Sequence, residues 1–198
     1  MHPRSHPGLP HRRSPRGGHD RRQHPSGSAR GARPDAAIGG TDLYGGAVRL
    51  YLVQHGPAKT EDEDPERPLT DEGVDIVRGV ARDAVERFGI RVGRVIHSGK
   101  ARSRQTAEAW GELLDTDVEQ ADALAPNDDP ATWVARLDGE TEDLMLVGHL
   151  PHLARLTGLL VTGTSDHSVV SFRQGGLVGL ERTDTGWGVS VVLPPEGA

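Results

Sequence analysis

The chain has 198 residues, enough for one domain with a hydrophobic core. It contains no cysteine, so disulfides, thiolate catalysis and cysteine-bound zinc are excluded. Its charge is unevenly divided, because residues 1–47 hold eight arginines against three aspartates, a net of +5, whereas residues 48–198 carry −11. An acidic domain argues against nucleic acid as the main partner. No stretch reaches the roughly 18 apolar residues of a membrane span, so we expect no membrane association.

The first 47 residues consist mainly of Pro, Gly, Arg, His and Ser, with almost no large apolar side chain. Such a segment cannot bury enough surface to offset the entropy of ordering, so residues 1–47 are predicted to be a disordered tail. Its arginine pairs are followed by no apolar region, so no secretory signal is expected. We predict a single folded domain over residues 48–198, in a cytoplasmic and monomeric protein.

Strand and helix patterns alternate along the first half of this domain. Residues 48–54 alternate as a strand, and Thr70 is the expected N-cap of a helix over 71–88. Its predicted apolar face is Val74, Val77, Val80/Ala81, Ala84/Val85 and Phe88. Residues 93–98 are predicted to form a second strand, and residues 100–114 a helix.

The second half continues the alternation and ends in strands alone. Pro130 should begin a short helix over 130–137, since proline is favoured in the first turn. Residues 143–149 read as a buried strand and 151–161 as a helix. Strands are predicted around Gly175–Gly176 and around a turn at Thr183–Gly186. This order predicts an α/β domain with helices on both faces of a mixed sheet.

Three of the apolar strands end in polar residues. The strand ends read His55-Gly56, His97-Ser98 and Gly148-His149. Ligands of open α/β sheets bind beyond the carboxyl ends of the strands. We therefore expect His55 and His149 to face one site.

Two histidines and an arginine at a helix start are suited to handling phosphate. His55 can attack phosphorus through one ring nitrogen if the other donates to a backbone carbonyl, and Gly56 allows that carbonyl to come close. Charged His149 would bind the equatorial oxygens, next to the helix that begins at Pro151. Arg102 would supply a planar, two-pronged donor.

Other readings of these residues are less favoured. His149 and His152 could hold a metal, but no third ligand has a recognisable spacing, so no metal is expected. His97 and His167 are expected to be ordinary histidines. Neither G-x-x-x-x-G-K-[ST] nor G-x-G-x-x-G occurs. The Ser, Asp and His of "GTSDHS" are too close in sequence to form a triad readily, and there is no G-x-S-x-G.

Three ordered motifs, "LVQHGPAK…DPERPLTDEG", "VIHSGKARSRQTAE" and "LVGHLPHLARL", resemble the histidine phosphatase superfamily, in particular the short phosphohistidine phosphatases of the SixA type. The resemblance implies a phosphoglycerate mutase-like, three-layer α/β sandwich with a mixed, mostly parallel sheet. It matches the nucleophile to His55, the second-motif arginine to Arg102 and the later phosphate-binding histidine to His149. It implies no cofactor. The expected substrate-binding residues are Gln54, Gly56, Lys59, Arg67 and Leu150.

The chain departs from the family pattern in two places. The family has arginine before the nucleophile, where this chain has Gln54, and Lys59 or Arg67 on the following loop could supply the missing charge. Larger members carry a glutamate general acid in the middle of the chain. The corresponding segment here, "ADALAPNDDPATW", offers only Asp122, Asp128 and Asp129, which resembles the short phosphohistidine group.

The sequence therefore leaves three functions open. The first is a metal-independent phosphatase that hydrolyses phosphohistidine on a partner protein, such as one of a phosphorelay or sugar-phosphotransferase system. The second is a phosphatase for small phosphomonoesters. The third is a phosphate- or phosphoprotein-binding module that lost turnover when arginine became Gln54.

Overall fold

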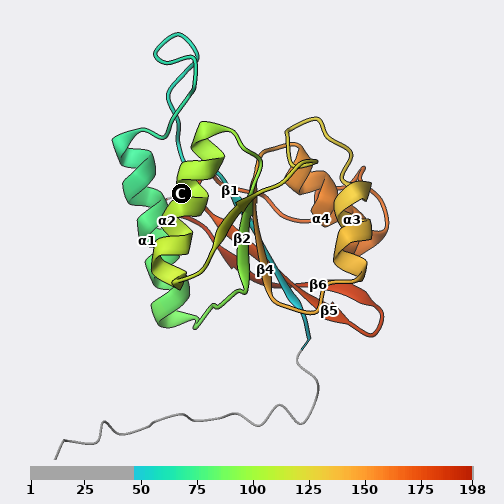
Figure 1. Cartoon of the computed structure of the whole chain (residues 1–198). Coiled ribbons are helices and arrows are strands. Elements are labelled where there is room, and N and C mark those ends of the chain that lie inside the picture. The colour runs from blue at the N-terminus through green and yellow to red at the C-terminus, as the bar shows by residue number, and fades with distance from the viewer. Residues whose placement is uncertain (1–46, 198) are drawn as a thin grey trace, which may run out of the picture. The chain divides into compact units, whose positions relative to one another are not determined.

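The computed structural model describes residues 47–197. These residues form one mixed six-stranded sheet and four helices (Figure 1). The predicted tail therefore lies outside the described residues, except for Ala47. Among the described residues, no helix is long and apolar enough to cross a membrane.

The strands lie in the order β3-β2-β4-β1-β5-β6. Three neighbouring pairs (β3 with β2, β2 with β4 and β4 with β1) are parallel, and the β1-β5 and β5-β6 pairs are antiparallel. The sheet is thus mixed and mostly parallel, as expected. The strand bounds are β1 Arg49–Gln54, β2 Arg94–His97, β3 Val118–Gln120, β4 Leu144–Gly148, β5 Leu177–Thr183 and β6 Gly186–Leu193.

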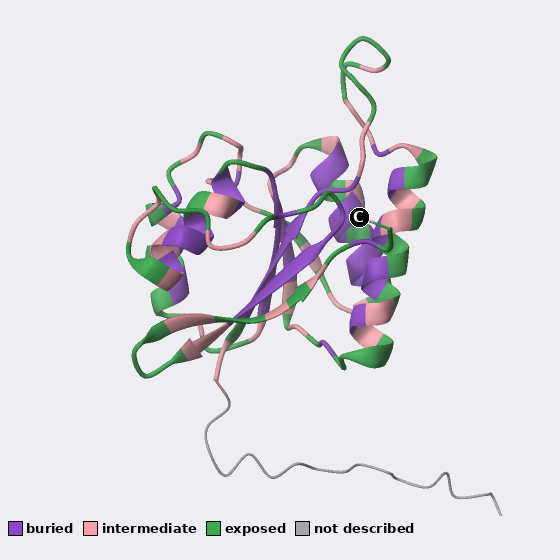
Figure 2. Ribbon diagram, turned by 180° about the vertical axis from the view of Figure 1, so that it is seen from behind, coloured by how far each residue is buried: buried purple, intermediate pink, exposed green. Residues whose placement is uncertain are grey.

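Helices cover both faces of the sheet. They are α1 Asp71–Arg87, α2 Ala101–Leu114, α3 Ala131–Asp138 and α4 His152–Thr162. Alternate side chains of a strand point to opposite faces. In β1, Tyr51 and Val53 pack in one cluster with side chains of α1 and α2, whereas Leu50 and Leu52 pack in a second cluster with those of α3 and α4. The central strands are buried between the two helical layers, which confirms the three-layer sandwich (Figure 2).

Helix α1 begins where the sequence predicts. Thr70 has extended backbone angles, and its side-chain oxygen accepts the Gly73 N–H at 3.0 Å. The helix ends at Arg87, one residue before Phe88, which is 52% exposed rather than part of the apolar face. The chain turns there, since Gly89 has a φ of +64°.

The remaining differences from prediction are local. Strand β3 was not predicted, because three residues at the edge of a sheet are too short to show a pattern. Pro130 lies just before α3 rather than inside it. Residues 167–174 form no strand, so the strand pattern before Gly175 was wrong, whereas β5 and β6 follow as a hairpin turning between Thr183 and Gly186.

Candidate active site

The polar strand ends meet at one edge of the sheet. Strands β2, β4 and β1 are adjacent and parallel, so Ser98, His149 and His55 follow their carboxyl ends side by side. The His55 N–H donates to the Gly148 carbonyl at 3.1 Å, and the ring centroids of His55 and His149 lie 5.0 Å apart at an angle of 56°. The two histidines therefore share one site.

The ring of His55 is held in one tautomer. Its Nδ1 lies 2.7 Å from the Gly56 carbonyl oxygen, to which it can only donate, so the lone pair is on Nε2. Burial lowers the pKa of His55 to about 4, although the bond to Gly56 acts in the opposite direction, and the charges of Arg102 and Arg67 lower it further. His55 is therefore neutral at pH 7, with Nε2 able to act as a nucleophile.

Gly56 is packed too closely for a side chain. A Cβ atom there would lie 2.7 Å from Val77 Cγ2 and 2.9 Å from the Gly73 carbonyl oxygen. The Gly56 N–H donates to Thr106 Oγ1 at 3.1 Å, and the Thr106 hydroxyl in turn donates to the Arg102 carbonyl at 2.8 Å. The carbonyl that orients His55 is thus anchored to helix α2.

Arg102 reaches His55 from the first turn of α2. Its Nε–H donates to His55 Nε2 at 3.2 Å, and its side chain is buried. Burial lowers the pKa of Arg102 from its usual value, as does the nearby charge of Arg67, yet an arginine remains a cation at neutral pH. In the free site, the Arg102 N–H therefore donates to the lone pair of His55 Nε2, the same lone pair that would bond to an incoming phosphoryl group.

His149 is neutral in the free site, so the charge expected on it when it binds phosphate oxygens requires that it take up a proton. Burial lowers its pKa to about 3, and the charges of Arg102 and Lys100 add to the effect. His149 Nε2 lies 2.6 Å from Ser98 Oγ, whereas its buried Nδ1 has no hydrogen-bond partner among the described residues. A bound anion would raise the pKa of this ring by removing the net positive field around it.

The other predicted binding residues lie at different distances from this centre. Gln54 is buried, and its Oε1 has no hydrogen-bond partner among the described residues. The loop after β1 projects beyond the strand ends and carries Lys59 and Arg67 (Figure 1). Of these two residues, Arg67 influences the site, because its charge lowers the pKa of His55 and that of Arg102. Lys59 is exposed. Leu150 is 40% exposed beside His149.

Sequence reasoning did not single out Ser98, Ser103, Thr106 or Lys100. Ser103 Oγ donates to the Val147 carbonyl at 2.7 Å and accepts the Ser98 N–H at 3.3 Å, so it ties α2 to the ends of β2 and β4. All four residues belong to the stretch "SGKARSRQT" around Arg102. Their position in this motif is the sequence signal that could have identified them as part of the site. His97 accepts the Gly99 N–H at 3.0 Å, a local contact.

Two cavities flank the centre. One, of about 330 Å³, lies between the loop after β1 and the start of α2, and is lined by Glu61, Pro65, Glu66, Arg67, Gly99, Lys100, Ala101 and Arg102. The other, of about 460 Å³, is lined by Ser98, Ala121, Asp122, Ala123, Ala125, Asp128 and Asp129. Ser98, Gly99 and Lys100 form the boundary between a cavity with three cations and a cavity with three aspartates.

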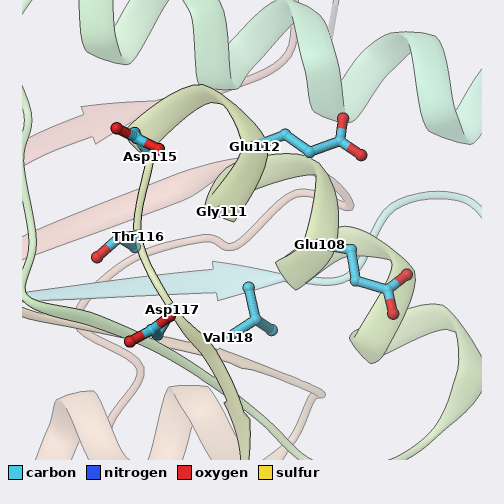
Figure 3. Close-up of a pocket in the computed structure, with 7 residues that line it drawn as sticks. All are labelled: Glu108, Gly111, Glu112, Asp115, Thr116, Asp117 and Val118. Carbon is cyan, nitrogen blue, oxygen red and sulfur yellow. The ribbon is translucent and has the colours of Figure 1, made fainter.

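A further cavity, of about 530 Å³, lies at the other end of α2, where β3 begins (Figure 3). Its charged side chains are all carboxylates, those of Glu108, Glu112, Asp115 and Asp117, which would repel phosphate. Among the described residues, no three His, Cys, Asp or Glu side chains are placed to hold a metal ion.

The fold has counterparts among solved structures. The protein histidine phosphatase SixA complexed with tungstate is 22% identical to this chain, with a TM-score of 0.66 over 75% of this chain and 97% of that one. A protein from Agrobacterium tumefaciens assigned as the phosphohistidine phosphatase SixA is 25% identical, with a TM-score of 0.62 over 75% and 98%. A mycobacterial glucosyl-3-phosphoglycerate phosphatase is 16% identical, with a TM-score of 0.59 over 75% and 100%. No protein-family model and no curated protein matches the sequence.

These structures are SixA phosphohistidine phosphatases and other members of the histidine phosphatase superfamily. The resemblance predicted from the three sequence motifs is therefore confirmed at the level of the fold. The match covers about three quarters of the chain and nearly all of each similar structure.

Proposed function

We propose that this protein is a metal-independent phosphatase that hydrolyses phosphohistidine on a partner protein through a phosphohistidine intermediate of its own. The observation that carries the proposal is the neutral His55 ring, whose Nδ1–H is committed to Gly56 while Nε2 points to Arg102. The likeness to SixA proteins, one of them complexed with tungstate, supports a site for a tetrahedral oxyanion.

In the first step, the phosphoryl group enters between Arg102, His149 and His55. The Arg102 N–H leaves His55 Nε2 and donates to a phosphoryl oxygen, while His149 takes up a proton and donates to another. The bond from His55 Nε2 to phosphorus forms as the phosphorus–nitrogen bond of the substrate breaks. The electron pair of that bond returns to the substrate imidazole, which leaves as a neutral ring when its far nitrogen is protonated.

In the second step, water attacks the phosphorus of phosphorylated His55. The phosphorylated ring is a cation, and the Nδ1–H bond to the Gly56 carbonyl stabilises this charge. When the phosphorus–nitrogen bond breaks, the electron pair returns to Nε2, and the two protons of water leave with dihydrogen phosphate. His55 is restored as the neutral tautomer that began the cycle.

The choice of phosphohistidine rests on the leaving group. An alkoxide is a poor leaving group, so ester hydrolysis gains about 10²–10⁴-fold from a positioned general acid. A protonated imidazole departs neutral, because the ring titrates near pH 6.5 in its free form. A site without a dedicated general acid therefore favours phosphorus–nitrogen bonds. Proteins of a phosphorelay or a sugar-phosphotransferase system carry such groups, and one of them is the partner we propose.

Acid-quench labelling tests the nucleophile. Labelled phosphohistidine protein should give the enzyme an acid-labile, base-stable phosphoryl group, which His55→Ala should abolish together with turnover. His167→Ala changes an exposed histidine and should leave both intact. Turnover by His55→Ala would overturn the mechanism. Stoichiometric binding of the substrate without phosphate release would instead identify a binding module.

One observation favours phosphatase action on small phosphomonoesters as the second candidate. Asp122, Asp128 and Asp129 line a cavity that also reaches Ser98, so an aspartate could protonate an alkoxide there. However, Asp128 and Asp129 already accept backbone N–H groups of their own segment, from Ala125 at 2.7 Å and Ala131 at 2.9 Å. These bonds restrain the carboxylates and weigh against the second candidate.

Substrate comparison separates the two candidates. We expect kcat/KM for phosphohistidine protein to exceed that for alkyl phosphates at least about tenfold, a conservative bound below the 10²–10⁴-fold contribution of a general acid. The rate on alkyl phosphates should barely change in Asp128→Asn or Asp129→Asn. Comparable rates on both substrates, together with a large loss on the ester in either variant, would favour the second candidate.

A further inference from the structure

Lys100 is the last residue before helix α2, at the boundary between the active centre and the cavity of about 330 Å³. The side chain is exposed, and the cavity it lines also contains Arg102, whose Nε touches the nucleophile. A molecule whose phosphoryl group is bound by Arg102 therefore has Lys100 within reach of its neighbouring atoms.

The cations of this cavity form no ion pair with a carboxylate in the part of the chain that the structure describes. None of the ion pairs within residues 47–197 includes Lys100, Arg67 or Arg102, although Glu61 and Glu66 line the same cavity. Arg104, two residues after Arg102 on the same helix, does pair, with Glu108 at 3.7 Å. Three cations without an ion-pair partner among the described residues therefore line this cavity, together with the two carboxylates of Glu61 and Glu66.

A phosphoryl group alone does not account for all three cations of this cavity. The phosphoryl group carries at most two negative charges, which Arg102 and the proton acquired by His149 balance. The charge of Arg67, on the loop after β1, lowers the pKa of His55 and that of Arg102. The charge of Lys100, at the start of α2, lowers the pKa of His149. Lys100 is not needed to balance the charge of the phosphoryl group. Its charge is available for a further anionic group.

Resting on the proposed function, we propose that Lys100 is a specificity-determining residue that binds a second negative charge on the substrate, next to the transferred phosphoryl group. The partner chemistry is a carboxylate a few bonds from phosphorus, which an acidic residue beside the phosphohistidine of the partner protein would supply. Glu61 and Glu66, on the loop side of the cavity, would repel a longer polyanion and so confine the second charge to the neighbourhood of Lys100.

A matched pair of phosphonates tests this without turnover. Phosphonoacetate and ethylphosphonate have the same two-carbon chain and a phosphorus–carbon bond that the enzyme cannot hydrolyse, but only phosphonoacetate carries a carboxylate. Calorimetry on the full chain at pH 7.5 should show phosphonoacetate binding about tenfold more tightly, the value of one charge-assisted hydrogen bond. In Lys100→Gln the preference should fall to about twofold, while the affinity for ethylphosphonate stays nearly constant.

Arg104→Gln is the control, because it removes one positive charge from the same helix at an exposed residue outside the cavity. It should keep the preference for phosphonoacetate. Equal binding of the two phosphonates by the unmodified protein, or equal effects of Lys100→Gln and Arg104→Gln, would overturn the inference and leave the proposed function standing. Binding of neither phosphonate would overturn the phosphate site itself, and with it both proposals.

Discussion

Lowering the pH from 7 to 5 should destabilise the folded protein through His55, because this ring is neutral when buried. The histidines of an unfolded chain titrate near pH 6.5, whereas burial lowers the pKa of His55 in the folded protein to about 4. Between these two values the unfolded chain binds a proton that the folded protein does not. The free energy of unfolding therefore falls as the pH falls through this window.

The magnitude follows from the two pKa values. With a pKa of 6.5 unfolded and about 4 folded, the loss between pH 7 and pH 5 is about 2 kcal/mol for this one ring. His149, whose pKa is lowered to about 3, should add a loss of about the same size. A histidine that titrated normally in the folded state would contribute nothing.

Urea unfolding of the full chain at pH 7 and pH 5 measures the effect. Carboxylates also titrate over this range, so the informative quantity is the difference between the unmodified protein and His55→Gln, which has no ring to protonate. We expect the variant to lose about 2 kcal/mol less than the unmodified protein. His167→Gln, at an exposed histidine, should behave like the unmodified protein. An identical pH dependence in the unmodified protein and His55→Gln would refute the assignment of a neutral, buried nucleophile.

Two substitutions probe the surroundings of His55. Gly56→Ala should lower the free energy of unfolding by about 1–3 kcal/mol, because the new Cβ would lie 2.9 Å from the Gly73 carbonyl oxygen. Unchanged stability in urea would show that the loop relaxes freely. Gln54→Arg should tighten vanadate binding about tenfold, the value of one charge-assisted hydrogen bond. Neutral or weaker binding by calorimetry would show that Arg67, whose charge already reaches His55 and Arg102, replaces the missing cation.

Local features of the chain were predictable because their causes are local. The Thr70 cap depends on one side chain and a backbone N–H three residues away, and the helical face of α1 depends on a period of 3.6 residues. The same reasoning placed His55 and His149 after buried strands, since an apolar run that ends in a polar residue marks the point where a strand leaves the core. Strand β3 escaped detection because three residues cannot display a period.

The sequence by itself determined the four helices, the strands other than β3, the three motifs and the histidines at the strand ends. Only the tertiary structure decided that β4 lies between β1 and β2, which places His149 next to His55, and that Arg102 contacts His55 across 47 positions of the chain. It also decided that both histidines are neutral and that, within residues 47–197, Lys100 forms no ion pair with a carboxylate. The reason is physical: strand pairing depends on which distant apolar faces bury one another, and the charge of a group depends on the burial and neighbours that this packing creates.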